Sequence, residues 1–451
     1  MLWAGLIVLA IPAASLLWRL LRRPQLGVLA LAAAAPFDGL LLLVDEPTFV
    51  TGWKEGLVVL TLLATVVAPG ASRAARPGMI PSWLGPVVAL LAISVVSALQ
   101  VELAVAAAGF KVDYFYLLIP LAIWRCPLNA EERDRLITIL MIGAVVTSLL
   151  GIAQQLLGED ALNRLGYEFN TVIRTTGDSV LRSFSTFELP FPFAFYVAFV
   201  LAVAAPVALA DLARFRSRLF LLFTPVLMLG ILSAVVRAAV LAIVVAVVYH
   251  LVRNYRAVLS ATPLLLLIVV VAPATLLSAV LSSRSLGERV DGWSLVADTV
   301  IAQPLGTGIG TTGSAAEVAL DYGGEIDETF GLTPDLLPYQ PDNYYVKRLL
   351  ELGPIGLWLT IALLRHVIES GRQTRKRASP ADVAMIDGFI ASVLGAAAAA
   401  VVATYWEIFP LDLYFWMMLG VLTSIDRAES PSPAWPSGQT ELAFRPTSAS
   451  S

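Results

Sequence analysis

Long apolar runs separated by short polar connections repeat along almost the whole chain, from Leu2 to Ile425. A helix needs about 20 apolar residues to cross the hydrocarbon core of a bilayer, and lipid offers the backbone no hydrogen-bond partners. Each run is therefore expected to form a transmembrane helix. The candidate spans are Leu2–Leu20, Leu26–Val44, Leu57–Val67, Leu84–Leu99, Leu103–Trp124, Leu136–Leu157, Phe191–Ala210, Leu219–Leu232, Ala234–Val252, Val258–Val280, Tyr345–Arg365, Val383–Thr404 and Leu411–Ile425.

Arginine and lysine gather in every second connection, and the alternate connections are acidic or poor in charge. Basic loops stay on the cytoplasmic side of a membrane, so this alternation predicts an odd number of spans with the N-terminus outside. Residues 1–426 then form one membrane domain. The Pro- and Ser-rich residues 427–451 are predicted to be a disordered cytoplasmic tail.

Composition supports the same fold class. Hydrophobic residues make up 58% of the chain and charged residues only 14%, with a mean hydropathy of +0.80. We therefore predict an all-α integral membrane protein, a bundle of about 12 to 13 transmembrane helices with a large extracytoplasmic loop that contains short surface helices.

Charge and residue usage exclude several functions. The net charge of -4 gives no electrostatic footprint for nucleic acid. The single cysteine, Cys126, and the two histidines, His250 and His366, lie at predicted inner ends of spans, which argues against a zinc centre at the outer face. No phosphate-binding loop with Gly-Lys-Ser/Thr occurs. We expect no metal and no cofactor.

Two predicted outer loops could carry chemistry, residues 158–186 and 281–343. In the longer one, Arg289–Gln303 places apolar residues at helical spacings, which predicts a helix on the membrane surface with Trp293 near the headgroups. Arg289 could bind phosphate or pair with a neighbouring acid. The glycines of Pro304–Gly313 permit either tight turns or a close approach to a ligand.

Other charged residues stand at or within predicted spans. Arg182 and Glu188 flank an aromatic and hydroxyl-rich segment that leads into a span, and Arg237 lies about one turn inside another span. Ionisable groups in membrane helices are candidates for function, although Arg237 could also extend to the headgroups. For three further residues we expect packing or cavity-lining roles: Asp38, Lys111 and Asp113.

Four segments, taken in order over roughly Arg182 to Leu357, resemble motifs of the O-antigen ligase and O-antigen polymerase superfamily of bacterial membrane glycan enzymes. Their sequences are RSFSTFELPFPFAFY with Arg182, SAVVRAAVLA with Arg237, ERVDGWSLVADTVIAQPLGTGIG with Arg289, Trp293 and Pro304 to Gly308, and PDNYYVKRLLELGPIGLW with Asn343, Tyr344, Glu351, Gly353 and Gly356.

One departure separates the branches of that superfamily. The ligase branch typically has histidine just before the asparagine of the fourth segment, and this chain has Asp342. Aspartate at this place is more similar to the polymerase branch. The resemblance thus favours a polymerase over a ligase that transfers glycan to a lipid or protein acceptor.

The resemblance implies glycosyl transfer at the outer face of the bacterial inner membrane. The donor would be a glycan on a polyprenyl pyrophosphate and the acceptor a glycan or lipid, with other polysaccharide-assembly membrane proteins as partners. Arg289 and Arg182 would bind the phosphates and Arg237 would assist. Asp342, or failing that Glu188, would act as general base. Asn343 would hold the acceptor, while Tyr344 and Trp293 would stack on sugar or anchor the site to the interface.

Two other classes fit a helical bundle with charges near one face. A transporter or flippase would place charges near the bilayer midplane and break its helices there. A membrane scaffold without catalysis would tolerate loss of all three arginines, Arg182, Arg237 and Arg289.

Overall fold

The computed structural model describes residues 17–43, 52–68, 81–167, 174–176, 180–253, 296–321 and 342–429. These residues are mostly helical, as predicted, and one short antiparallel hairpin pairs β1 (Arg174–Thr176) with β2 (Val180–Arg182). The helices are α2 (Gln25–Ala34), η1 (Ala35–Leu43), α4 (Trp53–Val67), α6 (Leu84–Ala98), α7 (Leu103–Tyr114), η2 (Phe115–Leu117), α8 (Leu118–Arg125), α9 (Ala130–Arg164), α10 (Pro190–Ala210), α11 (Phe215–Leu222), α12 (Thr224–Ser233), α16 (Ser314–Asp321), α17 (Tyr344–Arg375), α18 (Pro380–Ala399), η3 (Tyr405–Glu407) and α19 (Leu411–Glu429).

Several helices are long and apolar enough to cross a membrane. Within the described ranges there are five of them, or six if α11 and α12, bent by 41° relative to each other, form one span. The chain is therefore a multi-pass membrane protein by helix length and composition. The five are Leu103–Arg125, Ala130–Arg164, Pro190–Ala210, Tyr344–Arg375 and Pro380–Ala399.

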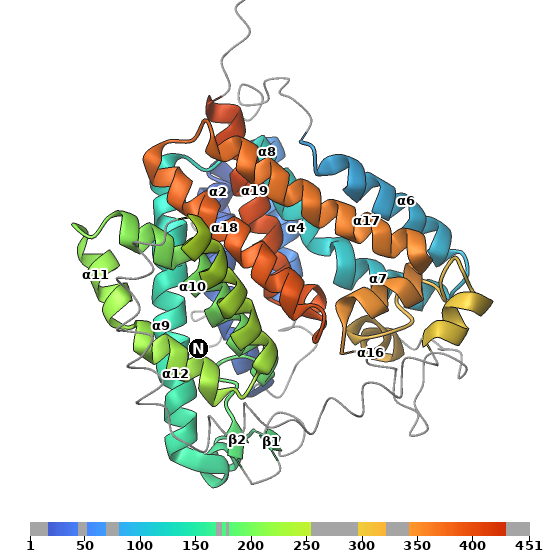
Figure 1. Cartoon of the computed structure of the whole chain (residues 1–451), viewed down its shortest axis with the longest axis horizontal. Coiled ribbons are helices and arrows are strands. Elements are labelled where there is room, and N and C mark those ends of the chain that lie inside the picture. Colours follow the sequence, from blue (N-terminus) through green and yellow to red (C-terminus); the bar gives the residue numbers. More distant parts are fainter. Residues whose placement is uncertain are drawn as a thin grey trace, which may run out of the picture.

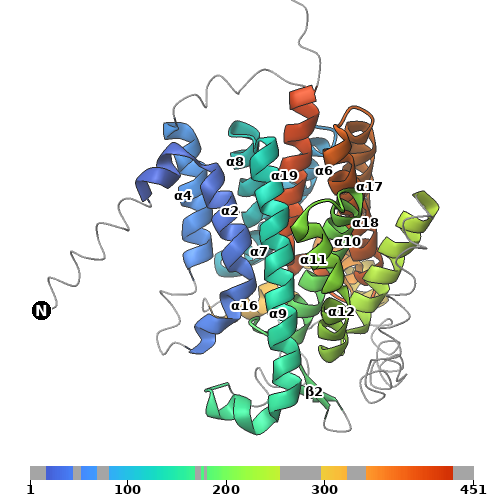
Figure 2. The same ribbon diagram turned by 90° about the vertical axis from the view of Figure 1, so that its left-hand side faces the viewer.

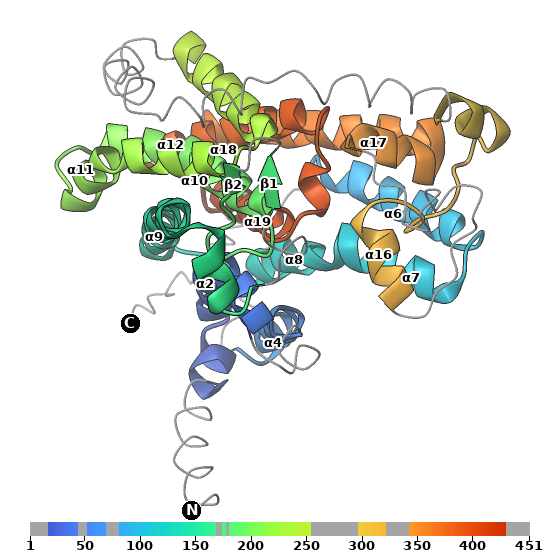
Figure 3. The same ribbon diagram turned by 90° about the horizontal axis from the view of Figure 1, so that it is seen from below.

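The helices pack around α19, which contacts α8, α10, α17 and α18 (Figure 3). On one side, α10 packs along α18, and α9 lies against α2, α10 and α12 (Figure 1). On another side, α17 packs along α6, and α7 carries α16. The core is continuous through these contacts, with aromatic side chains such as Tyr196, Phe199 and Tyr414 stacked between α10 and α19.

Two long helices are broken at glycines. In α9 the break is at Gly158, whose φ of +75° is left-handed, and the residues after it turn aside from the helix axis (Figure 2). In α17 it is at Gly353, with φ +67°, followed by Pro354. Glycine adopts this backbone region without steric cost, and proline cannot donate the next helical hydrogen bond. A third break, the η2 turn, separates α7 from α8.

Some predicted segments differ from the observed elements. The run expected at Leu84–Leu99 forms a helix of only 15 residues, and Leu219–Leu232 forms the bent pair α11 and α12. The predicted span Val258–Val280 lies outside the described residues, as does most of Leu2–Leu20. In the predicted loop 281–343, residues 296–302 are helical and α16 packs on α7.

Close packing of α10 on α18 yields the first prediction. An added methyl at Gly388 would lie 2.6 Å from the Val203 carbonyl oxygen, whereas one at Gly56 would meet nothing within 4 Å. Gly388→Ala should therefore lower stability by about 1–3 kcal/mol through overpacking. Gly56→Ala should be neutral or stabilise the exposed face of α4 by up to about 1 kcal/mol.

Thermal unfolding of the purified protein in detergent measures both variants. Equal unfolding midpoints for Gly388→Ala and Gly56→Ala would contradict the packing of these two helices.

Candidate active site

The first and second motif segments meet in space. The Ser183 amide donates to the Ser233 carbonyl at 3.0 Å, and Gln155 Nε2 donates to the carbonyls of both Leu181 and Ser233, at 2.5 and 2.9 Å. Val235, in the turn after Ser233, has φ +53°. A β-branched residue in this region is strained, and such strain persists only where the surroundings impose it. The turn that presents Arg237 is thus held in one conformation.

Arg182 contacts the turn that precedes Arg237. Arg182 Nε donates to the Ala234 carbonyl at 3.4 Å, three residues before Arg237. The Arg182 guanidinium also lies 5.0 Å from the Phe191 ring centroid, in the first turn of α10. Both arginines are half-buried. Two segments far apart in the sequence, each with an arginine, therefore meet near the start of α10.

Glu188 stands at the same end of α10, two residues before the helix begins, and its side chain is open to solvent. An ion pair lies near it, in which Lys54 Nζ is 2.6 Å from Asp38 Oδ2. Desolvation by the surrounding protein raises the pKa of Glu188, Lys54 lowers it and Asp38 raises it. A solvent-accessible carboxyl with a raised pKa is suited to accept a proton.

The third and fourth segments form a second junction. The Thr307 amide donates to the Leu350 carbonyl at 2.8 Å, and the Gly308 amide to the Glu351 carbonyl at 3.3 Å. A side chain at Gly306, which has φ +92°, would lie 2.3 Å from the Glu351 carbonyl oxygen. One at Gly353 would lie 2.3 Å from the Pro304 carbonyl oxygen. These glycines allow close contact of one backbone segment with another. Of the two roles expected from the sequence, tight turns or close approach to a ligand, this contact fits the first.

Glu351 fastens this glycine loop, residues 304–313, onto α17. Its Oε1 accepts from the amides of Gly310 and Thr312, at 3.2 and 3.3 Å, and from the Thr312 hydroxyl at 3.2 Å. Gly310 also packs against α7, where a side chain would lie 2.3 Å from the Val105 carbonyl oxygen. Glu351 of the fourth motif segment therefore holds the glycine loop of the third segment in place.

A buried ion cluster lies under that loop. Lys347, which has no exposed surface, places Nζ 3.2 Å from Asp113, 3.3 Å from Glu351 and 3.0 Å from Glu407. Arg348 Nη1 donates to Asp113 Oδ2 at 2.6 Å. We refer to these five residues as the Lys347 cluster. It joins α7, α17 and η3, whose residues are far apart in the sequence.

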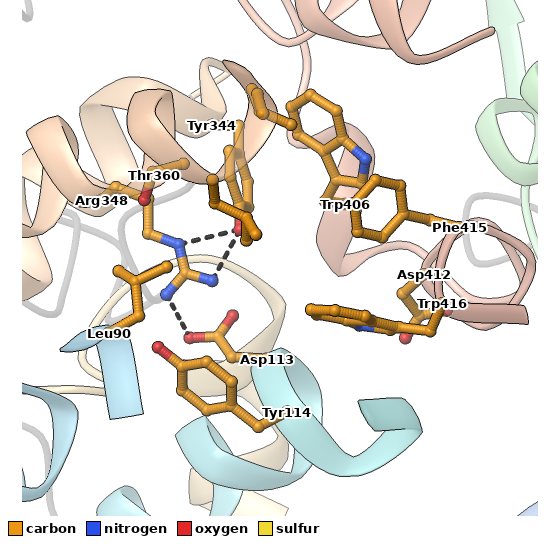
Figure 4. Close-up of a pocket in the computed structure, with 12 residues that line it drawn as sticks. Leu90, Asp113, Tyr114, Tyr344, Arg348, Thr360, Trp406, Asp412, Phe415 and Trp416 are labelled. Atoms are coloured by element: carbon orange, nitrogen blue, oxygen red, sulfur yellow. Dashed lines mark hydrogen bonds and ion pairs between the residues drawn. The ribbon is translucent and has the colours of Figure 1, made fainter. Parts of the chain in front are cut away.

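A small cavity of about 40 Å³ adjoins the Lys347 cluster. Figure 4 shows Asp113 and Arg348 on one side of it, with Trp406, Asp412 and Trp416 on the other. This volume holds only a few water molecules, so the cavity is too small for a sugar. Asp113 lines it, as the sequence analysis expected for that residue.

The fourth segment's predicted site residues have the following positions. Asp342 is exposed. Asn343 caps α17, because its Oδ1 accepts from the amides of Tyr345 and Val346 at 2.9 and 3.1 Å. Tyr344 is buried, and its hydroxyl accepts from Arg348 Nε and Nη2 at 2.8 and 2.6 Å (Figure 4). Contacts within the fold thus account for Asn343 and Tyr344.

Arg289 and Trp293, predicted for the third segment, lie outside the described residues. Sequence reasoning passed over five charged residues that the structure brings near the predicted ones: Lys54, Lys347, Arg348, Glu407 and Asp412. Each is an ionisable group at the edge of an apolar run, and that signal could have marked them. Across the described parts of the chain, no three His, Cys, Asp or Glu side chains converge as metal ligands would.

No protein-family model matches the chain, and no curated protein sequence matches it. The family resemblance therefore rests on the four sequence segments alone and stays a prediction.

The Lys347 cluster yields the second prediction. Lys347→Met would leave three buried carboxylates facing one remaining cation, Arg348. Removing one partner of a buried ion pair typically costs about 3–5 kcal/mol, so this variant should be strongly destabilised. Lys376→Met, at the exposed far end of α17, should leave stability unchanged.

The yield of monodisperse protein and its thermal unfolding in detergent test this expectation. A Lys347→Met protein as stable as Lys376→Met would show that the cluster does not hold the fold together.

Proposed function

We propose that this chain is a glycosyltransferase-type polymerase, which joins polyprenyl-pyrophosphate-linked oligosaccharide repeat units at the outer face of the bacterial inner membrane. The observation that carries the proposal is the junction of the first two motif segments, where Arg182 contacts the turn that bears Arg237, with Glu188 at the same end of α10. That junction supplies cations for a pyrophosphate and a carboxylate for an acceptor hydroxyl at one end of α10.

The proposal also includes a membrane topology, with more spans than the described helices and with an assigned outer side. About 12 to 13 spans, an outer N-terminus and a cytoplasmic tail would place the start of α10, the start of α17 and the loop 281–343 on the outer side. In support, the charged residues of both junctions lie at ends of helices that this orientation predicts to be outer: Asp38, Lys54, Glu188, Lys347 and Asp412.

Charge stabilisation on the leaving group is the main task of such an enzyme. Negative charge builds on the pyrophosphate as its bond to the sugar breaks, and guanidinium groups offer paired donors to phosphate oxygens. Arg182 and Arg237 would bind these oxygens, with Arg289 beside them. The polyprenyl chain would lie against the membrane helices. No metal is required for this step, since the leaving group is already activated.

Glu188 is the better supported general base, with Asp342 as the other candidate. It shares the start of α10 with Arg182, and its pKa is raised by the surrounding protein. It would accept the proton of the acceptor hydroxyl while that oxygen attacks the sugar carbon and the carbon–phosphate oxygen bond breaks. A ligase, with a lipid or protein acceptor, would use the same groups.

Transport is the second candidate function, and one observation favours it. The helices of the segments Leu103–Arg125 and Tyr344–Arg375 are both broken, at η2 and at Gly353, and the buried Lys347 cluster lies between them. Broken helices around buried charges are typical of transporters. Purified protein in liposomes with a labelled lipid-linked glycan separates the classes, because a polymerase makes longer chains and a flippase only moves the lipid across.

The third prediction concerns the arginines. Arg182→Ala and Arg237→Ala should each lower the rate of chain extension by about a hundredfold or more, because each removes a donor to developing charge. Arg289→Ala should do the same. Arg218→Ala is the matched control, because Arg218 is exposed and belongs to α11, which follows the opposite end of α10.

Mass spectrometry of polyprenyl-linked glycans in cells that lack the gene measures this effect. Single repeat units should accumulate without the protein and with the three arginine variants, but not with native protein or Arg218→Ala. Long chains that accumulate on the carrier would indicate a ligase, and an unchanged lipid pool would refute both transferase activities.

The fourth prediction concerns pH. If Glu188 acts as its ionised form, kcat/KM falls as pH drops through its raised pKa, and Glu188→Gln abolishes that acid limb. Lys54 lowers this pKa and Asp38 raises it. Lys54→Met should therefore move the acid limb to higher pH, and Asp38→Asn should move it to lower pH.

The opposite signs make this pair informative, because both substitutions break the same Lys54–Asp38 ion pair. A shift in the same direction for both variants would mean that the ion pair acts through structure and that Glu188 is not the titrating group.

A further inference from the structure

A cavity of about 420 Å³ lies at the end of the bundle where α10 and α17 finish and α18 begins. This is the end opposite the Lys347 cluster, since α17 runs from one to the other (Figure 1). Its walls come from α10, α11, α12, α18 and the helical residues 237–253. It shares no residue with either motif junction.

The walls of the cavity are mostly apolar, with alanines among larger aliphatic side chains. Ala202 and Ala246, both buried, lie side by side with Ala391, and Ala205, Leu209 and Val247 line the space beside them. Small residues leave room between membrane helices that larger side chains would fill. The volume lies in the range of small-ligand pockets, about 300–1,000 Å³, and the lining suits a hydrocarbon chain.

One end of the cavity is polar and positively charged. Arg253, Arg375 and His250 line it together with one acid, Asp387. Arg375 Nε donates to both oxygens of Asp387, at 2.7 and 2.8 Å. With both arginines and the aspartate ionised, this end carries a net charge of +1 even when His250 is neutral.

His250 gives a second, independent sign of a ligand. Its Nε2 is buried and makes no hydrogen bond of 3.5 Å or less within the described protein, although the ring lies near the Ala202 backbone. The ring lines the cavity and packs on Tyr249, at 5.4 Å between centroids, and the Arg253 guanidinium lies 5.7 Å from the same tyrosine ring. A buried polar atom without a partner is costly, and a ligand oxygen would satisfy it.

We propose that this cavity binds one phospholipid with an anionic headgroup. The negatively charged phosphate meets His250 and Arg253, and one acyl chain lies along the wall that contains Ala202 and Ala205. The charge surplus selects an anionic over a zwitterionic lipid. The site is separate from the proposed glycosyl transfer, and the inference holds whichever leaflet this end of the bundle faces.

Native mass spectrometry of the delipidated protein, titrated with phosphatidylglycerol or phosphatidylcholine, tests the proposal. Phosphatidylglycerol should bind more tightly. A basic residue contributes about 1 kcal/mol toward an anionic headgroup, so Arg253→Gln should weaken phosphatidylglycerol binding about fivefold and leave phosphatidylcholine binding unchanged. Arg218→Gln, which removes the same charge from an α11 position that does not line the cavity, should bind like native protein.

A second variant tests whether the cavity wall binds the acyl chain of the lipid. Ala205→Leu places a larger, still apolar side chain in the cavity wall and should weaken both lipids while the thermal unfolding midpoint without lipid stays unchanged. The proposal is overturned if phosphatidylglycerol and phosphatidylcholine bind equally, or if Arg253→Gln and Arg218→Gln behave alike. Because lipid binding is read directly, a failure here leaves the glycosyl-transfer proposal untouched.

Discussion

The contact on which this structure depends is the one between Lys347 and its three carboxylates. Helices in a membrane gain little from hydrophobic association, because the lipid around them is as apolar as their side chains. Polar contacts and close backbone approach then decide which helices pack together. Lys347 supplies the polar contacts that join α17 to α7 and η3, and Glu351 adds polar contacts to the glycine loop.

The two motif junctions differ in whether their charged groups are engaged in the fold or accessible to a ligand. Around Glu351, the motif residues make contacts within the fold. The glycines leave room for a backbone carbonyl, the carboxylate accepts hydrogen bonds from loop amides, and the asparagine caps a helix. Around Arg182, the charged groups are half-buried or open to solvent, beside a turn held in a strained conformation. Chemistry is therefore better sought at the junction around Arg182 than at the one around Glu351.

Apolar periodicity predicted most helices, since a run such as Phe191–Ala210 has few alternatives in lipid. The break at Gly353 was not predicted, since Tyr345–Arg365 was expected as one span, although glycine followed by proline could have marked it. The η2 break was not predicted either, although Pro120 could have marked it, because a proline ring clashes with the carbonyl four residues earlier, here that of Tyr116. The bent pair α11 and α12 was expected as one straight span.

The candidate site was harder to predict, because it depends on pairs that are distant in the sequence. Nothing near Lys347 indicates that Asp113 and Glu407 will surround it, and the sequence analysis gave it no role. The partners of Glu351 are backbone amides, and because every residue type but proline has one, no sequence pattern predicts this contact. By contrast, the depth of Arg237 and the position of Arg182 before a span were sufficient to select both residues.

The glycine contacts at Gly306 and Gly353 bear on how such a chain can diverge. Where two side chains touch, a change in one can be matched by a change in the other, so the aromatic contacts between α10 and α19 can be replaced step by step. Where a glycine meets a backbone carbonyl, every possible neighbour presents the same carbonyl, and no second substitution makes room. Short glycine signatures can then outlast the overall similarity of the sequences that contain them.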